Sequence, residues 1–120
     1  MIDTISIAGK EYTLSPMNIW EVTELLFVLK PYAHLFDEEI DVYEFVKKLM
    51  LEAKDKGPID PFRALALMYH VDADNFIDIK TTGRELVSAL RDGLIFHEVK
   101  TLMEFGQVLG IIEGEKDGAS

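Results

Sequence analysis

The sequence has no cysteine, which excludes disulfide bonds, thiol catalysis and thiolate metal sites. It also has no long hydrophobic run. The longest run of large apolar residues covers positions 25–29, far short of the roughly 20 residues with which a helix spans a bilayer. The N-terminus lacks the basic segment followed by an apolar segment that is typical of a signal peptide. From these absences we expect a soluble cytoplasmic protein.

Basic residues are scarce as well: 12 Lys and Arg residues against 22 Asp and Glu residues leave a net charge of −10. This charge repels phosphate backbones and anionic lipids, so neither a nucleic acid nor a membrane is expected as a partner. A protein that mimics nucleic acid toward a basic host factor agrees with the charge, but no sequence pattern favours it.

The length of 120 residues and the hydrophobic content of 48% suit one domain with a single core, which we place at residues 1–112. The expected fold class is mainly α, with an N-terminal two-stranded β-hairpin over residues 4–14 and a small bundle of four to five helices over residues 16–110. Residues 113–120 contain no apolar side chain larger than alanine and are expected to form a disordered acidic tail.

The hairpin is predicted from alternating apolar residues on both sides of a glycine. With Gly9-Lys10 as a type II′ turn, the large apolar side chains pair across the strands and share one face, while Ser6 and Thr13 lie on the other. The competing turn, Ala8-Gly9, requires positive φ at Ala8 and misaligns the apolar pairs, so the first register is favoured. A lone hairpin is marginally stable, so this apolar face must pack on helices or on a partner. In the favoured register the pairs are Ile7 with Tyr12 and Ile5 with Leu14.

Capping signals divide the remaining chain into helices. Ser15 as N-cap and Pro16 at the first helical position predict a helix that ends near Lys30, before Pro31. Asp41 with Glu44 three residues later predicts a second helix, which Gly57-Pro58 terminates.

The C-terminal half follows the same logic. Asp60-Pro61 predicts a third helix that ends around His70, and Thr82 with Glu85 predicts a fourth that ends near Gly93. A fifth helix follows over residues 95–109, with Gly106 where a bulky neighbour can pack closely. The pattern leaves open whether the last two helices are continuous. Residues 72–80 suit a short helix or an ordered loop.

The strongest metal-like pattern starts at Asp72, where Asp72 and Asp74 have the spacing of the first ligands of a calcium loop. The loop is incomplete, because Ile77 occupies the position that needs glycine and Gly83 the position that needs a bidentate glutamate. No two of the three histidines have the i,i+4 spacing of a zinc site. We therefore predict no metal and no cofactor, and keep a metal-dependent enzyme or regulator centred on His70, Asp72 and Asp74 as an alternative.

No nucleophile elbow, paired catalytic carboxylates or dinucleotide-binding glycine pattern occurs, so the protein is not expected to be an enzyme. Trp20 and Phe27 instead make the first helix apolar beyond a single stripe. One interpretation is that this helix is the central core helix. The other is that one side of it, together with the hairpin, forms a groove or an oligomer surface.

Two segments, Ile7-Ala-Gly-Lys-Glu-Tyr-Thr-Leu-Ser-Pro16 and Thr82-Gly-Arg-Glu-Leu86, resemble the phage and prophage tail assembly chaperones. Many members of this family have a basic residue where this chain has Ser15. The resemblance implies a non-enzymatic protein of the host cytoplasm that binds the long, hydrophobic tape-measure protein, keeps it soluble and assists assembly of the tail-tube protein around it. It also implies possible self-association, and an oligomeric structural head or tail component is the alternative. The candidate partner contacts, or their immediate support, are Ile5, Ile7, Tyr12, Leu14, Trp20 and Phe27.

Overall fold

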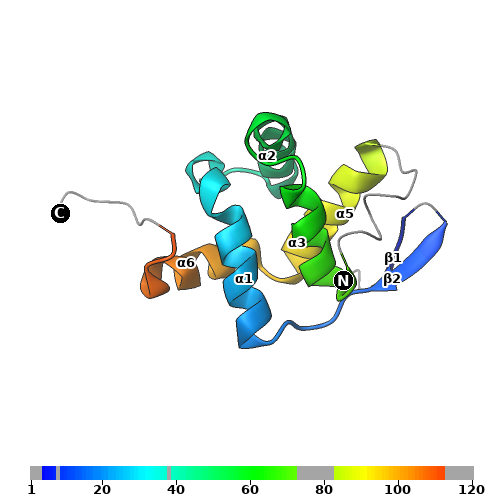
Figure 1. Ribbon diagram of the computed structural model, residues 1–120, viewed down its shortest axis with the longest axis horizontal. Coiled ribbons are helices and arrows are strands. Elements are labelled where there is room, and N and C mark those ends of the chain that lie inside the picture. Colours follow the sequence, from blue (N-terminus) through cyan, green and yellow to red (C-terminus); the bar gives the residue numbers. More distant parts are fainter. Residues whose placement is uncertain (1–3, 8, 38, 73–82, 113–120) are drawn as a thin grey trace.

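The chain starts as an antiparallel hairpin and continues as helices in the computed structural model, which describes residues 4–7, 9–37, 39–72 and 83–112 (Figure 1). The expected mainly helical class with an N-terminal two-stranded sheet is confirmed. The tail from residue 113 and residues 73–82 lie outside the described part, and so do the predictions made for them. The elements are β1 (Thr4–Ile7), β2 (Lys10–Thr13), α1 (Ile19–Leu29), the 3-10 helix η1 (Lys30–Leu35), α2 (Val42–Lys56), α3 (Asp60–Tyr69), α5 (Gly83–Phe96) and α6 (Val99–Leu109).

The hairpin has a different register from the predicted one. Ile5 lies opposite Tyr12 and Ile7 opposite Lys10, so Lys10 is paired within β2 and the predicted Gly9-Lys10 turn was wrong. Gly9 has φ +84°, a left-handed conformation that glycine adopts without steric cost. The register differs by two residues, and an even shift leaves every side chain on its predicted face. Lys10, now on the apolar face, places its ammonium 5.6 Å from the centre of the Tyr12 ring.

The apolar face of the hairpin packs on the C-terminal half of the chain. Strand β1 lies against α5, and the Tyr12 ring meets the Tyr69 ring of α3 edge-on, with 6.1 Å between their centres. Figure 1 shows the hairpin at one end of the molecule and α6 at the other, with α1 and α3 between them. The hairpin therefore belongs to the core through α3 and α5.

Helix α1 starts three residues later than predicted because Asn18, not Ser15, is its N-cap. The Asn18 side chain accepts a hydrogen bond from the Glu21 backbone N–H (2.8 Å), and the Glu21 carboxylate accepts one from the Asn18 backbone N–H (2.9 Å). This reciprocal arrangement satisfies two backbone donors at once. The N-cap predicted for the third helix was also displaced: Asp60 is the first residue of α3, and its carboxylate accepts a hydrogen bond from the Tyr32 hydroxyl (2.6 Å).

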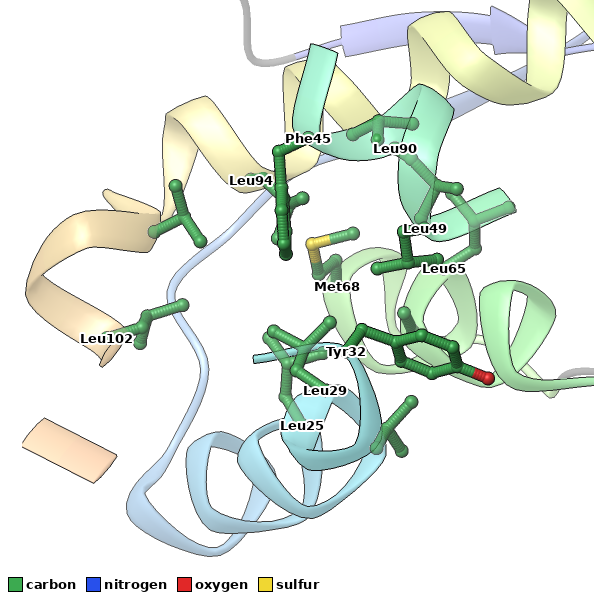
Figure 2. Packing of buried hydrophobic residues seen from close by; sticks show 14 of the residues in the cluster. Leu25, Leu29, Tyr32, Phe45, Leu49, Leu65, Met68, Leu90, Leu94 and Leu102 are labelled. Atoms are coloured by element: carbon green, nitrogen blue, oxygen red, sulfur yellow. The ribbon is translucent and has the colours of Figure 1, made fainter. Parts of the chain in front are cut away.

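The core lies where α3 crosses between α1 and α5, with α2 covering α5 (Figure 2). Figure 2 shows leucines of α1, α2 and α5 directed toward Met68 of α3, while the Tyr32 hydroxyl points away from them. A Cβ atom at Gly93 of α5 would lie 2.8 Å from the sulfur of Met68, so the glycine lets the two helices approach closely. The buried side chains form one cluster that extends from Ile7 to Ile112.

Helices α5 and α6 are separate, and the break comes later than predicted. Helix α5 runs through Gly93 to Phe96, because close packing on α3 holds that glycine within the helix. The chain then turns at Glu98, whose φ is +55°. At the other end of α6, a Cβ atom at Gly106 would lie 2.5 Å from Ile112 Cγ1 and 3.1 Å from Leu26 Cδ2, which confirms the predicted close approach.

Candidate partner-binding surface

The six candidate contact residues separate into a buried group and an exposed group. Ile7, Tyr12 and Leu14 are buried in the core, and Ile5 is half-buried against it. A partner of the folded chain therefore cannot contact Ile7, Tyr12 and Leu14, and these three residues can only support the surface from within the core. Trp20 is 77% exposed and Phe27 is 55% exposed, so the accessible candidates are both on α1.

Helical geometry explains why α1 exposes these two aromatic side chains. Its opposite face carries the leucine and valine side chains that contact α3 and α6, and those side chains are buried. Trp20 and Phe27 are seven residues apart, so they project in nearly the same direction, about 10 Å from each other along the helix axis. Glu24 lies between them on the same face and is exposed. We call Trp20, Glu24 and Phe27 the α1 stripe.

Glu24 was not among the predicted site residues, although the sequence contains the signal for it. It stands four residues after Trp20 and three before Phe27, which is the spacing of neighbours on one helix face. Glu24 forms no ion pair with any residue that the structure describes. The stripe therefore combines two exposed aromatic rings with one carboxylate that is free for an interaction outside the chain.

The N-terminal end of α1 is fixed to α3 through His70, the residue that follows α3. One ring nitrogen of His70 lies 3.2 Å from the Glu21 carboxylate, and the other lies 3.2 Å from the Ser15 carbonyl oxygen. Both partners are acceptors, so the imidazole makes both hydrogen bonds only when both its nitrogens carry protons. Together with the Asn18 cap, these contacts hold the first turn of α1, which carries Trp20, in a defined position.

The same contacts bear on the metal alternative. Both ring nitrogens of His70 already have protein partners, Asp72 is exposed, and Asp74 lies outside the described residues. Within the described ranges, no group of three His, Cys, Asp or Glu side chains is arranged to hold a metal ion. His34 is also engaged, with its Nε2 2.8 Å from the Glu52 carboxylate.

His97, between α5 and α6, is a half-buried imidazole. Burial lowers the pKa of His97, and the charge of His70 lowers it further, while a hydrogen bond with the Met68 backbone and the charge of Glu21 act in the opposite sense. Its Nε2 is buried without a hydrogen-bond partner among the described residues. The neutral imidazole is therefore the form that this environment favours.

The two most exposed large aliphatic side chains of the described residues lie on α2 and α6, in different surroundings. Leu51 of α2 is 72% exposed and has Lys47, Lys48, Lys54 and Asp55 as its neighbours at helical spacing. Val108 of α6 is 82% exposed near the end of the helix. Within the described residues, neither helix places two exposed aromatic rings around an acid as α1 does.

Comparison of the chain with protein-family models, with curated proteins and with solved structures gave no match in any of the three. Among the helices of the described part, none has the length and apolar character needed to cross a bilayer.

Proposed function

We propose that the protein is a phage or prophage tail assembly chaperone, which binds the tape-measure protein, keeps it soluble and assists assembly of the tail tube in the host cytoplasm. The observation that carries the proposal is the exposure of Trp20 and Phe27 together on α1 of a strongly acidic helical protein. Tryptophan and other aromatic residues are enriched at protein interfaces, where they supply much of the binding free energy. The net charge of −10 favours a soluble complex once such a surface holds an apolar partner.

Coexpression of the chain with the tape-measure protein encoded beside it tests the proposal. The expected result is a larger soluble fraction of the tape-measure protein and its recovery together with the chaperone. An unchanged soluble fraction, with the chaperone itself folded and abundant, would contradict the function.

An oligomeric structural head or tail component is the second candidate, favoured by the N-terminal sheet. The described part of this sheet has two strands, so each strand has an outer edge to which a strand of another molecule can add. Sedimentation at high protein concentration tests this candidate, because a strictly monomeric species would count against it.

A further inference from the structure

The α1 stripe has a chemistry that selects one kind of occupant. We infer that it binds an amphipathic helix of a different protein, one that places a Lys or Arg residue between two apolar side chains on its contacting face. This inference rests on the proposed function, because it names the part of the tape-measure protein that the chaperone would bind.

The spacing of the stripe favours a helix. Trp20 and Phe27 are two helical turns apart, so a partner helix packed along α1 meets both rings with side chains that are themselves about two turns apart. Rings exposed at 77% and 55% can each lose a large apolar area on contact. A helix that covers them gains most of its binding free energy from these two positions.

Charge then decides between a second copy of the chain and another protein. A two-fold pair of α1 helices that stacks Trp20 and Phe27 of one copy on those of the other also brings the two Glu24 carboxylates together. Each copy carries a net charge of −10, which adds repulsion over a longer range. A partner with a Lys or Arg opposite Glu24 replaces this repulsion with attraction, so the stripe fits a basic amphipathic helix better than it fits itself.

The position of α1 agrees with a preformed docking surface. The helix packs on α3 and α6 through its buried face, and Asn18, Glu21 and His70 fix its first turn. Side chains presented by a fixed helix lose less conformational freedom on binding than side chains of a disordered segment.

Trp20 is the only tryptophan in the chain, so its fluorescence reports contact at the stripe directly. The probe is a synthetic peptide of about 18 residues, made of Leu and Lys in an amphipathic helical pattern without aromatic residues. Two matched peptides serve as controls: one with Glu in place of Lys, and one with the Leu and Lys residues scrambled. The Leu–Lys peptide should shift Trp20 emission to shorter wavelength with saturation, whereas neither control peptide should.

Variants locate the contact. Phe27→Ala should weaken binding of the Leu–Lys peptide at least about tenfold, while Leu51→Ala, which shortens an even more exposed apolar residue on α2, should leave it unchanged. Glu24→Lys should weaken binding more than Glu44→Lys, which changes the net charge of the protein by the same amount on another helix. All four substitutions are at exposed positions, and circular dichroism confirms that each variant is folded.

Several results would overturn the inference. These are equal binding of the Leu–Lys and Leu–Glu peptides, equal effects of Glu24→Lys and Glu44→Lys, and unchanged binding by Phe27→Ala. A wild-type dimer in sedimentation that Phe27→Ala converts to a monomer would also overturn it, because a second copy would then cover the stripe.

Coexpression separates this inference from the proposed function. If the wild-type chain raises the soluble fraction of the tape-measure protein and Phe27→Ala does so equally well, the function stands and the docking surface is wrong. If the wild-type chain has no effect although the peptide binds the stripe as expected, the docking surface stands and the function is wrong.

Discussion

Replacement of Gly106 by alanine tests how the C-terminal end of the chain is packed. The new methyl group would lie 2.5 Å from Ile112 Cγ1 on one side and 3.1 Å from Leu26 Cδ2 on the other. Ile112 has little freedom to move away, since its backbone N–H and that of Ile111 both donate to the Gly106 carbonyl oxygen, at 3.1 Å and 2.9 Å. The substitution therefore introduces overlap between α6, α1 and the segment that follows α6.

Two opposing contributions set the size of the effect. Alanine is a better helix former than glycine, which stabilises the folded state by about 1 kcal/mol. Overpacking of a filled core costs about 1–3 kcal/mol, and the alternative of expelling Ile112 into water costs about as much in lost burial. The expected net change is a decrease of up to about 2 kcal/mol in the free energy of unfolding, measured by urea denaturation followed by circular dichroism.

A double-mutant cycle with Ile112→Ala identifies the cause. Ile112→Ala alone should cost about 2 kcal/mol or more through the lost burial and the cavity. In the double variant the added methyl group occupies part of the space that Ile112 vacates. The loss in free energy of unfolding of the double variant should therefore be at least about 1 kcal/mol smaller than the sum of the losses of the two single variants. Gln107→Ala, at the exposed neighbouring position, should change stability little. A Gly106→Ala protein more stable than the wild type, or additive effects in the cycle, would refute the reasoning.

Three further predictions concern the cap and the buried titratable groups. Asn18→Ala should lower the free energy of unfolding by about 1 kcal/mol in urea denaturation, because it removes the α1 cap. Ser15→Ala should have little effect. Equal losses in the two variants would contradict the observed cap. Burial raises the pKa of Tyr69, so the folded chain keeps a proton that the unfolded chain loses above pH about 10. This group should therefore lower the free energy of unfolding by about 1.4 kcal/mol per pH unit above that pH. Tyr69→Phe should remove this part of the slope in denaturation measured between about pH 9 and 11. Burial lowers the pKa of His97, so its contribution to stability is present above the ordinary histidine pKa and is lost as pH falls below it. His97→Gln should therefore flatten the decrease in the free energy of unfolding between about pH 7 and 5. An unchanged decrease would contradict this role.

The local sequence pattern was sufficient to predict the elements whose signals are short-range. The apolar alternation of the hairpin predicted which face each side chain occupies, and that prediction survived the wrong turn because the register shift was even. Asp41 and Gly57 predicted both ends of α2, although the Asp41 side chain makes no capping hydrogen bond. Gly106 was also recognised as a site of close approach, although the identity of its neighbours Leu26 and Ile112 required the structure.

The errors at the helix ends came from contacts between residues far apart in sequence. Ser15 and Asn18 are both good N-cap residues, and the choice between them depends partly on His70, which binds the Ser15 carbonyl oxygen from 55 residues away. Gly93 has the local signature of a helix end, but the fit against Met68 makes it a packing position inside α5. Short-range rules rank such alternatives evenly, and the tertiary contact decides between them.

The candidate surface shows the same division between local and long-range information. Leu25 to Leu29 form one continuous apolar segment, and nothing within it indicates that Phe27 alone is exposed; that follows from where α3 and α6 contact the helix. Conversely, burial of Tyr12 and Leu14 moves the candidate contacts from the hairpin to α1. Since the backbone of α1 is already fixed by its cap and by His70, a partner helix should associate with the Phe27→Ala variant at nearly the same rate as with the wild type and dissociate from it faster. Stopped-flow fluorescence of Trp20 measures both rates, and a change confined to association would show that the stripe is not formed before the partner binds.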